Sequence, residues 1–170
     1  MIVLTTETPD DHWEIEALLD TAFAPGRTGL SSYQLREGVD PVAPLCLTAR
    51  DNDEIAALAG TIRFWPIRIG ESAAPALLLG PVAAHPTRQG EGIGAMLILE
   101  GLERAASAGW ERCILIGDEP YYARFGFRRE LAKVIVFPPP TNPNRILAKE
   151  LIRGAMTGVS GPVKRWHTGD

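Results

Sequence analysis

Several features that would mark particular classes of protein are scarce in this chain of 170 residues. It has two cysteines, Cys46 and Cys113, each inside an apolar run, so we expect two buried, reduced strand residues rather than a disulfide framework. Neither cysteine has the spacing of a metal ligand, and His12, His85 and His167 are scattered without a partner pattern. The sequence therefore gives no support for a metal site.

An excess of positive charge and long apolar runs are also missing. The 17 Lys and Arg residues face 21 Asp and Glu residues, which gives a net charge of −4 without a basic run. This balance makes nucleic acid and anionic membranes poor candidate partners. No apolar run is long enough to span a bilayer, and the N-terminus lacks the basic and apolar regions of a signal peptide. The cytoplasm is therefore the expected compartment.

The remaining composition is that of an ordinary globular protein, with 45% hydrophobic and 22% charged residues. A chain of this length can bury one sizeable core but is too short for two comfortable domains. We therefore expect a single domain over residues 1–170. Within it, residues 153–170 are mostly small and polar, and this tail is expected either to drape over the body or to be loose.

The most informative stretch runs from residue 76 to residue 106. The apolar run Ala76–Ala84 predicts a buried strand. Proline lacks a backbone N–H, so Pro81 predicts a bulge or a place where this strand splays from a neighbour. A glycine-rich turn, Arg88–Gly94, leads into an amphipathic helix. The expected buried face of that helix is Ala95, Ile98, Leu99, Leu102 and Ala106.

The glycine-rich turn has the chemistry of a phosphate site. Glycines let backbone N–H groups converge ahead of a helix N-terminus, which carries a positive partial charge. Arg88 and Gln89 could add side-chain donors. Phosphate or pyrophosphate is therefore the expected ligand, and a plain connection whose glycines only ease a tight turn is the alternative.

Two common phosphate-binding motifs fit this turn poorly. A P-loop is excluded because Gly94 is not followed by Lys and Ser or Thr. The dinucleotide fingerprint G-x-G-x-x-G/A is matched formally by Gly90, Gly92 and Ala95, with Asp118 at a tolerable distance. That fingerprint should follow its strand directly, whereas residues 85–89 intervene here. A dinucleotide-dependent oxidoreductase is thus kept only as an alternative.

The other expected elements suggest an α/β protein of mixed α+β type. Strands that follow one another through short turns favour antiparallel pairing, whereas Arg112–Ile116 is expected to run parallel to Ala76–Ala84 after the helix. Asp10 is a possible N-cap of the first helix, which Pro25-Gly26 would end. Ser31–Gly38 is expected to form a second, short helix. The further predicted strands are Met1–Thr6, Leu45–Arg50, Ile55–Ile69 as one strand or two, Leu131–Phe137 and Ile146–Ile152.

Two segments carry a resemblance to a known family. The turn Gln89–Gly94 matches the pattern Q/R-x-x-G-x-G/A at every fixed position, and Leu79–Pro86 looks like the strand that precedes it. Further along, Tyr122–Phe127 has the pattern Y-x-x-x-G-F within the segment Gly117–Phe127. In these features the chain resembles the GCN5-related N-acetyltransferases (GNAT), and among them small uncharacterised bacterial members. The resemblance implies a central mixed, mostly antiparallel sheet with a parallel strand–helix–strand crossover and flanking helices.

The resemblance also implies a reaction and its residues. The acetyl group of acetyl-CoA would pass directly to a primary amine, with strand residues pairing with the pantetheine arm and N–H groups of the turn holding the pyrophosphate. Tyr122 would protonate the departing CoA sulfur as general acid, since a donor that meets the developing charge improves the leaving group; the alternative is that Tyr121 and Tyr122 only cap a core. The implied cofactor-binding residues are Val82, Ala83, Ala84, Gln89, Gly90, Glu91, Gly92, Ile93, Gly94 and Ala95.

The acceptor and the base are left open by the sequence. Contacts to the acceptor are implied for Phe23, Arg27, Tyr33 and Arg36, with ordinary packing and solvated charge as the alternative. No motif assigns a base among Glu71, Asp118, Glu119 and His85. A small-molecule amine is the default acceptor and a peptide amine the other, a homodimer is expected by resemblance alone, and a non-catalytic acyl-CoA-binding or sensing module is a second possible function.

Overall fold

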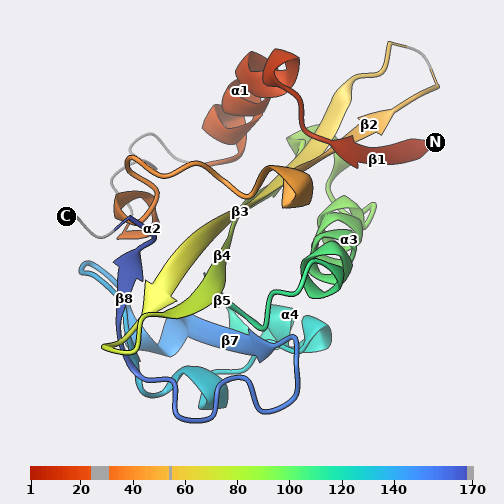
Figure 1. Ribbon diagram of the computed structural model, residues 1–170. Coiled ribbons are helices and arrows are strands. Elements are labelled where there is room, and N and C mark those ends of the chain that lie inside the picture. Colours follow the sequence, from red (N-terminus) through yellow and green to blue (C-terminus); the bar gives the residue numbers. More distant parts are fainter. Residues whose placement is uncertain (24–30, 54, 168–170) are drawn as a thin grey trace.

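The computed structural model describes residues 1–23, 31–53 and 55–167, and a mixed sheet forms its centre (Figure 1). The strands follow the order β1-β2-β3-β4-β5-β7, with β8 pairing to β3 and β6 pairing to β8. Most pairs are antiparallel, and β4 with β5 and β6 with β8 are parallel. The predicted fold class, a mixed and mostly antiparallel sheet with flanking helices, is confirmed. The strands are β1 Ile2–Thr6, β2 Leu47–Asp51, β3 Leu58–Ile69, β4 Ala74–Ala84, β5 Arg112–Ile116, β6 Ile135–Val136, β7 Ile146–Glu150 and β8 Gly161–Arg165.

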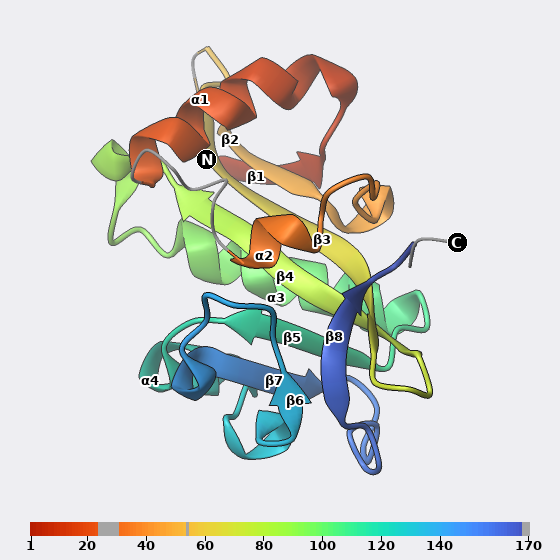
Figure 2. The same cartoon turned by 90° about the vertical axis from the view of Figure 1, so that its left-hand side faces the viewer.

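The helices lie on both faces of this sheet (Figure 2). On one face, α3 packs over β2, β3 and β4, and its side chains join the largest core cluster. On the other face, Ile15, Leu18 and Leu19 of α1 pack against Leu58 and Ala83 of the sheet. The α-helices are α1 His12–Ala22, α2 Ser31–Gln34, α3 Ile93–Ser107 and α4 Glu119–Tyr122, and the short 3₁₀ segments are Pro9–Asp11, Ala43–Leu45, Pro86–Arg88, Ala123–Phe125, Glu130–Ala132 and Pro143–Arg145.

Strand β4 keeps its neighbour β5 for only part of its length. The parallel register covers Leu77 opposite Cys113 and Leu78 opposite Ile114, and it ends there, although β4 continues to Ala84. On its other side, the register of β4 with β3 shifts between Ile62 and Phe64. The bulge and the splay that Pro81 predicts are therefore both present, and the parallel crossover through α3 is confirmed.

The buried face of α3 differs from the predicted one. Leu99 is 56% exposed, whereas Gly101 lies in the core against the ring of Phe64. The apolar pattern cannot place Gly101 on the buried face, because a glycine that admits a neighbouring ring carries no apolar signal of its own. The predicted face is therefore rotated away from the contact with Phe64. The residues that α3 buries are Ile93, Leu97, Ile98, Gly101, Leu102 and Ala105.

Two N-terminal predictions need correction. Asp10 does not cap the first helix: Asp11 precedes α1, and its carboxylate accepts the Thr8 N–H at 2.8 Å. The second helix ends at Gln34, and turns rather than helix lead on to Gly38. Pro25 and Gly26 lie outside the described residues.

The C-terminal third also departs from the predicted strands. Leu131–Phe137 is not a strand, since it holds a 3₁₀ turn and only the two-residue strand β6. The last strand is β8 rather than β7, and it pairs antiparallel with Ile67, Arg68 and Ile69 of β3. This end of β3 extends past its pairing with β2, so a backbone edge is available there. The tail is expected either to drape over the body of the domain or to be loose. Residues 161–165 lie on the body, because they pair with β3.

The two thiols lie in the interior. Cys113 belongs to β5 and Cys46 directly precedes β2, and both are buried and free. Burial raises the pKa of the Cys46 thiol to about 11, since a thiolate is poorly solvated there. Separately, no helix among the described residues has the length and apolar character needed to cross a membrane.

Replacing Gly101 with alanine tests the contact between α3 and the sheet. A Cβ at Gly101 would lie 2.5 and 2.8 Å from two ring atoms of Phe64, so the helix would have to move. Overpacking of this kind costs about 1–3 kcal/mol, which outweighs the gain of about 1 kcal/mol in helix propensity. We expect Gly101→Ala to lower the free energy of unfolding, measured in urea.

The double variant Phe64→Leu, Gly101→Ala serves as the control. A smaller side chain at position 64 makes room for the new methyl group. The loss in free energy of unfolding of the double variant should therefore be smaller than the sum of the losses of the two single variants. Strict additivity of the two single-variant losses would contradict the close packing of Gly101 on Phe64.

Candidate active site

The backbone of β4 is open on one side where β5 has diverged. The His85 N–H donates to the Ala59 carbonyl of β3 at 2.8 Å. Successive residues of a strand direct their backbone groups to opposite sides, so the N–H and C=O groups of Val82 and Ala84 face away from β3. The residue between them, Ala83, has a buried side chain that packs toward α1. The predicted pair Val82 and Ala84 thus presents strand backbone to open space.

The glycine-rich turn ends at the N-terminus of α3. Gly90 and Gly92 have φ values of +86° and +78°, a region that side-chain-bearing residues rarely adopt. Gly92 is the N-cap and has no side chain to accept a capping bond, and the first bond within the helix runs from the Met96 N–H to the Gly92 carbonyl. The N–H groups of Ile93, Gly94 and Ala95 precede that bond and point out of the helix end. Gly94, predicted as part of the turn, lies in the first turn of the helix.

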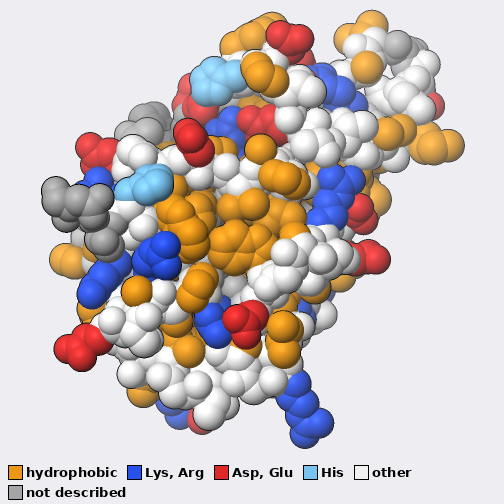
Figure 3. All heavy atoms as spheres, viewed as in Figure 1, with side chains coloured by type: hydrophobic (Ala, Val, Ile, Leu, Met, Phe, Trp, Pro, Cys, Tyr) orange, Lys and Arg blue, Asp and Glu red, His pale blue; other side chains and the backbone are white. Residues whose placement is uncertain are grey.

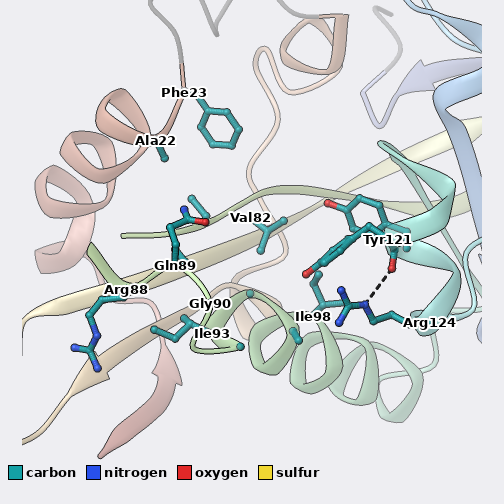
Figure 4. A pocket seen from close by; sticks show the side chains of 16 residues that line it. Ala22, Phe23, Val82, Arg88, Gln89, Gly90, Ile93, Ile98, Tyr121 and Arg124 are labelled. Carbon is teal, nitrogen blue, oxygen red and sulfur yellow. Dashed lines mark hydrogen bonds between the residues drawn. The ribbon is translucent and has the colours of Figure 1, made fainter. Parts of the chain in front are cut away.

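A cavity of about 550 Å³ joins this turn to the open side of β4 (Figure 4). Of the ten predicted cofactor-binding residues, all except Glu91 line it. The Glu91 carboxylate instead accepts two hydrogen bonds from Arg88, at 2.8 and 2.9 Å. Arg88 also donates to Asp51 at 3.0 Å, so its guanidinium is held by carboxylates. The further lining residues are Ala22, Phe23, Arg88, Ile98, Tyr121, Tyr122 and Arg124.

Two tyrosines from α4 close the far end of this cavity. Gly126 has a φ of +92° and ends the short helical segment, as the sequence predicts. The ring of Tyr122 packs edge-on to Phe127 and against Gly117, where a Cβ would clash with the ring. Burial raises the pKa of Tyr122, with smaller contributions of the same sign from Tyr121 and Asp118. Tyr122 therefore keeps its proton at neutral pH.

A second cavity of about 340 Å³ lies on the other side of the tyrosines. It shares Phe23, Val82, Tyr121 and Tyr122 with the first cavity, so the two cavities adjoin where β4 leaves β5. The remaining lining residues are Ser32, Tyr33, Arg36, Leu78, Leu79, Gly80, Pro81, Leu115, Ile116, Gly117, Asp118 and Arg145.

The predicted acceptor residues gather at this second cavity. Phe23, Tyr33 and Arg36 line it, and Arg27 lies outside the described residues. Sequence reasoning missed Arg145, which pairs with Asp118 at 3.5 Å. No local signal marks Arg145: it reaches the site because β7, which follows it, pairs with β5.

The candidate bases separate by position. Asp118 lines the second cavity, whereas Glu71, Glu119 and His85 line neither cavity. The His85 ring nitrogen accepts the Thr87 N–H at 3.2 Å, which makes it a turn residue. Glu119 accepts the Arg129 N–H at 2.7 Å. None of these contacts assigns a base.

Among the described residues, neither charged nor metal-ligating side chains gather into a further site. On the face in Figure 3, acidic and basic side chains are interspersed rather than gathered by sign. Among the residues that the structure describes, no group of three or more His, Cys, Asp or Glu side chains could hold a metal ion. Among the described residues, the polar groups that line the two cavities include backbone donors, tyrosine hydroxyls, arginines and Asp118.

Comparison with known proteins points the same way. The sequence model of the "Acetyltransferase (GNAT) domain" family matches residues 5–129. A curated relative from Escherichia coli K12, an uncharacterized N-acetyltransferase YhbS, is 26% identical over 163 residues, which cover 96% of this chain and 95% of that protein.

Solved structures share the fold. The crystal structure of E. coli YhbS in complex with CoA has a TM-score of 0.81 at 24% identity, covering 96% of this chain and 89% of that one. A GNAT family acetyltransferase from Brucella melitensis, in complex with acetyl-CoA, has a TM-score of 0.74 at 28% identity, covering 99% and 97%. The family match spans most of the chain, and it includes β4, the glycine-rich turn and the tyrosine segment of α4. This chain belongs to the GNAT family of N-acetyltransferases.

Proposed function

We propose that this enzyme transfers the acetyl group of acetyl-CoA directly to a primary amine at the junction of the two cavities. The observation that carries the proposal is this junction: the open backbone of β4, the uncapped end of α3 and the two tyrosines line two adjoining cavities. The similar Brucella protein, which was solved with acetyl-CoA, supports the choice of co-substrate.

The first cavity suits the CoA part of acetyl-CoA. The N–H groups at the turn, from Gly90 to Ala95, would hold the pyrophosphate, with Gln89 beside them. The backbone of Val82 and Ala84 would pair with the amides of the pantetheine arm, as a further strand would. Glu91 stays outside the lining, so any contribution of this residue comes from its backbone or through Arg88.

The reaction would take place beside the tyrosines. The neutral amine attacks the thioester carbonyl, the carbon–sulfur bond breaks, and Tyr122 gives its proton to the departing sulfur. The proton that the nitrogen loses passes to solvent, from which the tyrosinate is protonated again. The raised pKa of Tyr122 keeps this acid protonated at working pH. Holding the amine and the thioester together supplies the larger part of the acceleration, about 7–11 kcal/mol in well-oriented systems.

The competing functions make different demands on the fold. A doubly wound dinucleotide-binding domain needs a mostly parallel sheet, whereas this sheet is mostly antiparallel, with β4–β5 and β6–β8 as parallel pairs among the described strands. A sensing module would bind acetyl-CoA without turnover, which the Tyr122 variant below distinguishes. The small-molecule acceptor, the homodimer and the cytoplasmic location stay predictions.

Thermal melting with acetyl-CoA tests the phosphate site. A ligand at 100 times its Kd that binds only the native state stabilises by about 2.7 kcal/mol, so acetyl-CoA should raise Tm and NADH should not. Gly90→Asp should weaken acetyl-CoA binding at least about tenfold, since the new carboxylate would face the pyrophosphate.

Gly90→Asn is the matched control for Gly90→Asp. Asn and Asp have the same size and both tolerate a positive φ, and only Asp adds charge. Acetyl-CoA should therefore stabilise Gly90→Asn more than Gly90→Asp. Equal shifts for the two variants would mean that this turn does not hold the pyrophosphate.

Replacing Tyr122 with phenylalanine tests the general acid. The ring contacts with Phe127 and Gly117 remain while the hydroxyl is lost. We expect kcat to fall about 10²-fold or more, with the Kd of acetyl-CoA nearly unchanged. In the wild type, kcat should hold through neutral pH and decline as the pH rises through the raised pKa of Tyr122.

Tyr121→Phe is the control for this experiment. Tyr121 stands edge-on to Tyr122, with ring centroids 4.9 Å apart, and shares both cavities. Its hydroxyl has no assigned proton transfer, so the loss in kcat should be clearly smaller. If kcat falls more in Tyr121→Phe than in Tyr122→Phe, the general acid is Tyr121. If both variants keep the kcat of the wild type, neither tyrosine acts as a general acid.

A further inference from the structure

Among the described residues, the charged side chains that line the first cavity are two arginines. Arg88 is fully engaged, because its three guanidinium nitrogens donate to Glu91 and Asp51 at 2.8 to 3.0 Å. Arg124 is exposed, and its Nε donates to the Tyr121 carbonyl at 3.2 Å. Within the described part of the chain, no carboxylate pairs with Arg124 and no other hydrogen bond holds its guanidinium. The first cavity therefore carries a positive charge that these residues do not balance.

Aromatic rings hold Arg124 beside the end of α3. Its guanidinium carbon lies 4.2 Å from the ring centroid of Tyr121 and 5.5 Å from that of Phe125. The hydroxyl end of Tyr121 reaches the first turn of α3, since a Cβ at Gly94 would lie 3.7 Å from that oxygen. Figure 4 shows the Arg124 side chain extending toward the side of the cavity where α3 carries Ile98, about 6 Å beyond Gly94 along the helix. The charge of Arg124 thus lies close to the glycine-rich turn.

The chemistry of CoA calls for a second anion site near this turn. Its pyrophosphate is joined to a ribose, and the same ribose carries a separate, doubly charged 3′-phosphate. The N–H groups at the turn can hold the pyrophosphate, so the 3′-phosphate needs another donor at about the distance of a sugar. Arg88 would have to give up its carboxylates to serve, whereas Arg124 has both Nη groups available, and paired guanidinium donors match phosphate oxygens.

We propose that Arg124 binds the 3′-phosphate of CoA, and that this contact makes the enzyme select free acetyl-CoA over acetyl donors that lack this phosphate. The inference rests on the proposed function, from which it takes acetyl-CoA as the ligand. An acetyl group carried on the phosphopantetheine of a carrier protein has the same pantetheine arm but no 3′-phosphate. The backbone of β4 would accept either donor, and Arg124 distinguishes between them.

Two ligands that differ only in this phosphate test the proposal. The Kd values of CoA and of 3′-dephospho-CoA are measured by calorimetry with the purified protein. The wild type should bind CoA about tenfold more tightly or better, since the dephospho ligand lacks the charge-assisted contact. Low ionic strength is used, because salt screens a contact to an exposed arginine.

Variants assign this preference to Arg124. Arg124→Gln should weaken the binding of CoA about tenfold and leave that of 3′-dephospho-CoA nearly unchanged, so the ratio of the two Kd values approaches one. Arg124→Lys should give a ratio between those of the wild type and Arg124→Gln, because lysine keeps the charge and loses the paired donors. Should Arg124→Gln fail to fold, Arg124→Lys alone must lower the ratio.

Arg128→Gln is the matched control. Arg128 is also exposed and follows in the same segment, but it lines neither cavity. Its replacement removes the same charge from the protein, so a general effect of net charge would appear in this variant too. The ratio of the two Kd values in Arg128→Gln should equal that of the wild type.

The outcomes separate this inference from the proposed function. Equal Kd values for the two ligands in the wild type, or a preference that survives in Arg124→Gln, overturn the 3′-phosphate site and leave acetyl transfer intact. An equal loss for both ligands in Arg124→Gln also overturns it, since Arg124 would then serve the pyrophosphate or the fold. If the wild type binds neither ligand, CoA is the wrong cofactor and the proposed function fails with this inference.

Discussion

The separation of β4 from β5 beyond Leu78 is the constraint on which the rest of the site depends. Two parallel strands that stayed paired would bury the backbone of Val82 and Ala84 in a ladder. Because they part, that backbone is open to a ligand, and the space between the strands becomes two cavities that meet at the tyrosines. A proline in the strand favours this separation, since it offers no N–H to a neighbour. The apolar core thus stays continuous on either side of an opening in its sheet.

Close packing elsewhere makes the opening tolerable. On one face, Gly101 lets α3 approach Phe64, so the helix that ends in the glycine-rich turn is pressed onto the sheet. On the other face, α1 is fixed by charge as well as by apolar contact: Arg63 of β3 pairs with Glu7 at 2.9 Å and Glu16 at 3.4 Å. A largely buried ion pair is a weak source of net stability, yet it defines orientation. Together these contacts place the turn and Phe23 on the same cavity.

The distribution of charge divides the site into two halves. At the turn, Arg88 is neutralised by Glu91 and Asp51, so an anion there would be held mainly by backbone N–H groups. In the second cavity, Arg36 brings a charge into a half-apolar space. The two tyrosines stand between these halves, and the burial of Tyr122 keeps it protonated. The site therefore has one end lined by backbone N–H groups at the turn and one half-apolar end beside Arg36.

Local pattern by itself determined the strand–turn–helix at residues 76–106, the bulge at Pro81, the short helix ended by Gly126 and the family, because these depend on proline, glycine and motif spacing within a few residues. It failed at α3, where the core residue Gly101 has no apolar signal, and at β8, which completes an edge of β3 nearly a hundred residues away. The sequence also named Tyr33 and Arg36 without their roles. Only the tertiary structure brought Arg36, Gly80 and Tyr122 to one cavity, because long-range pairing and burial, rather than neighbouring residues, decide which side chains share a space.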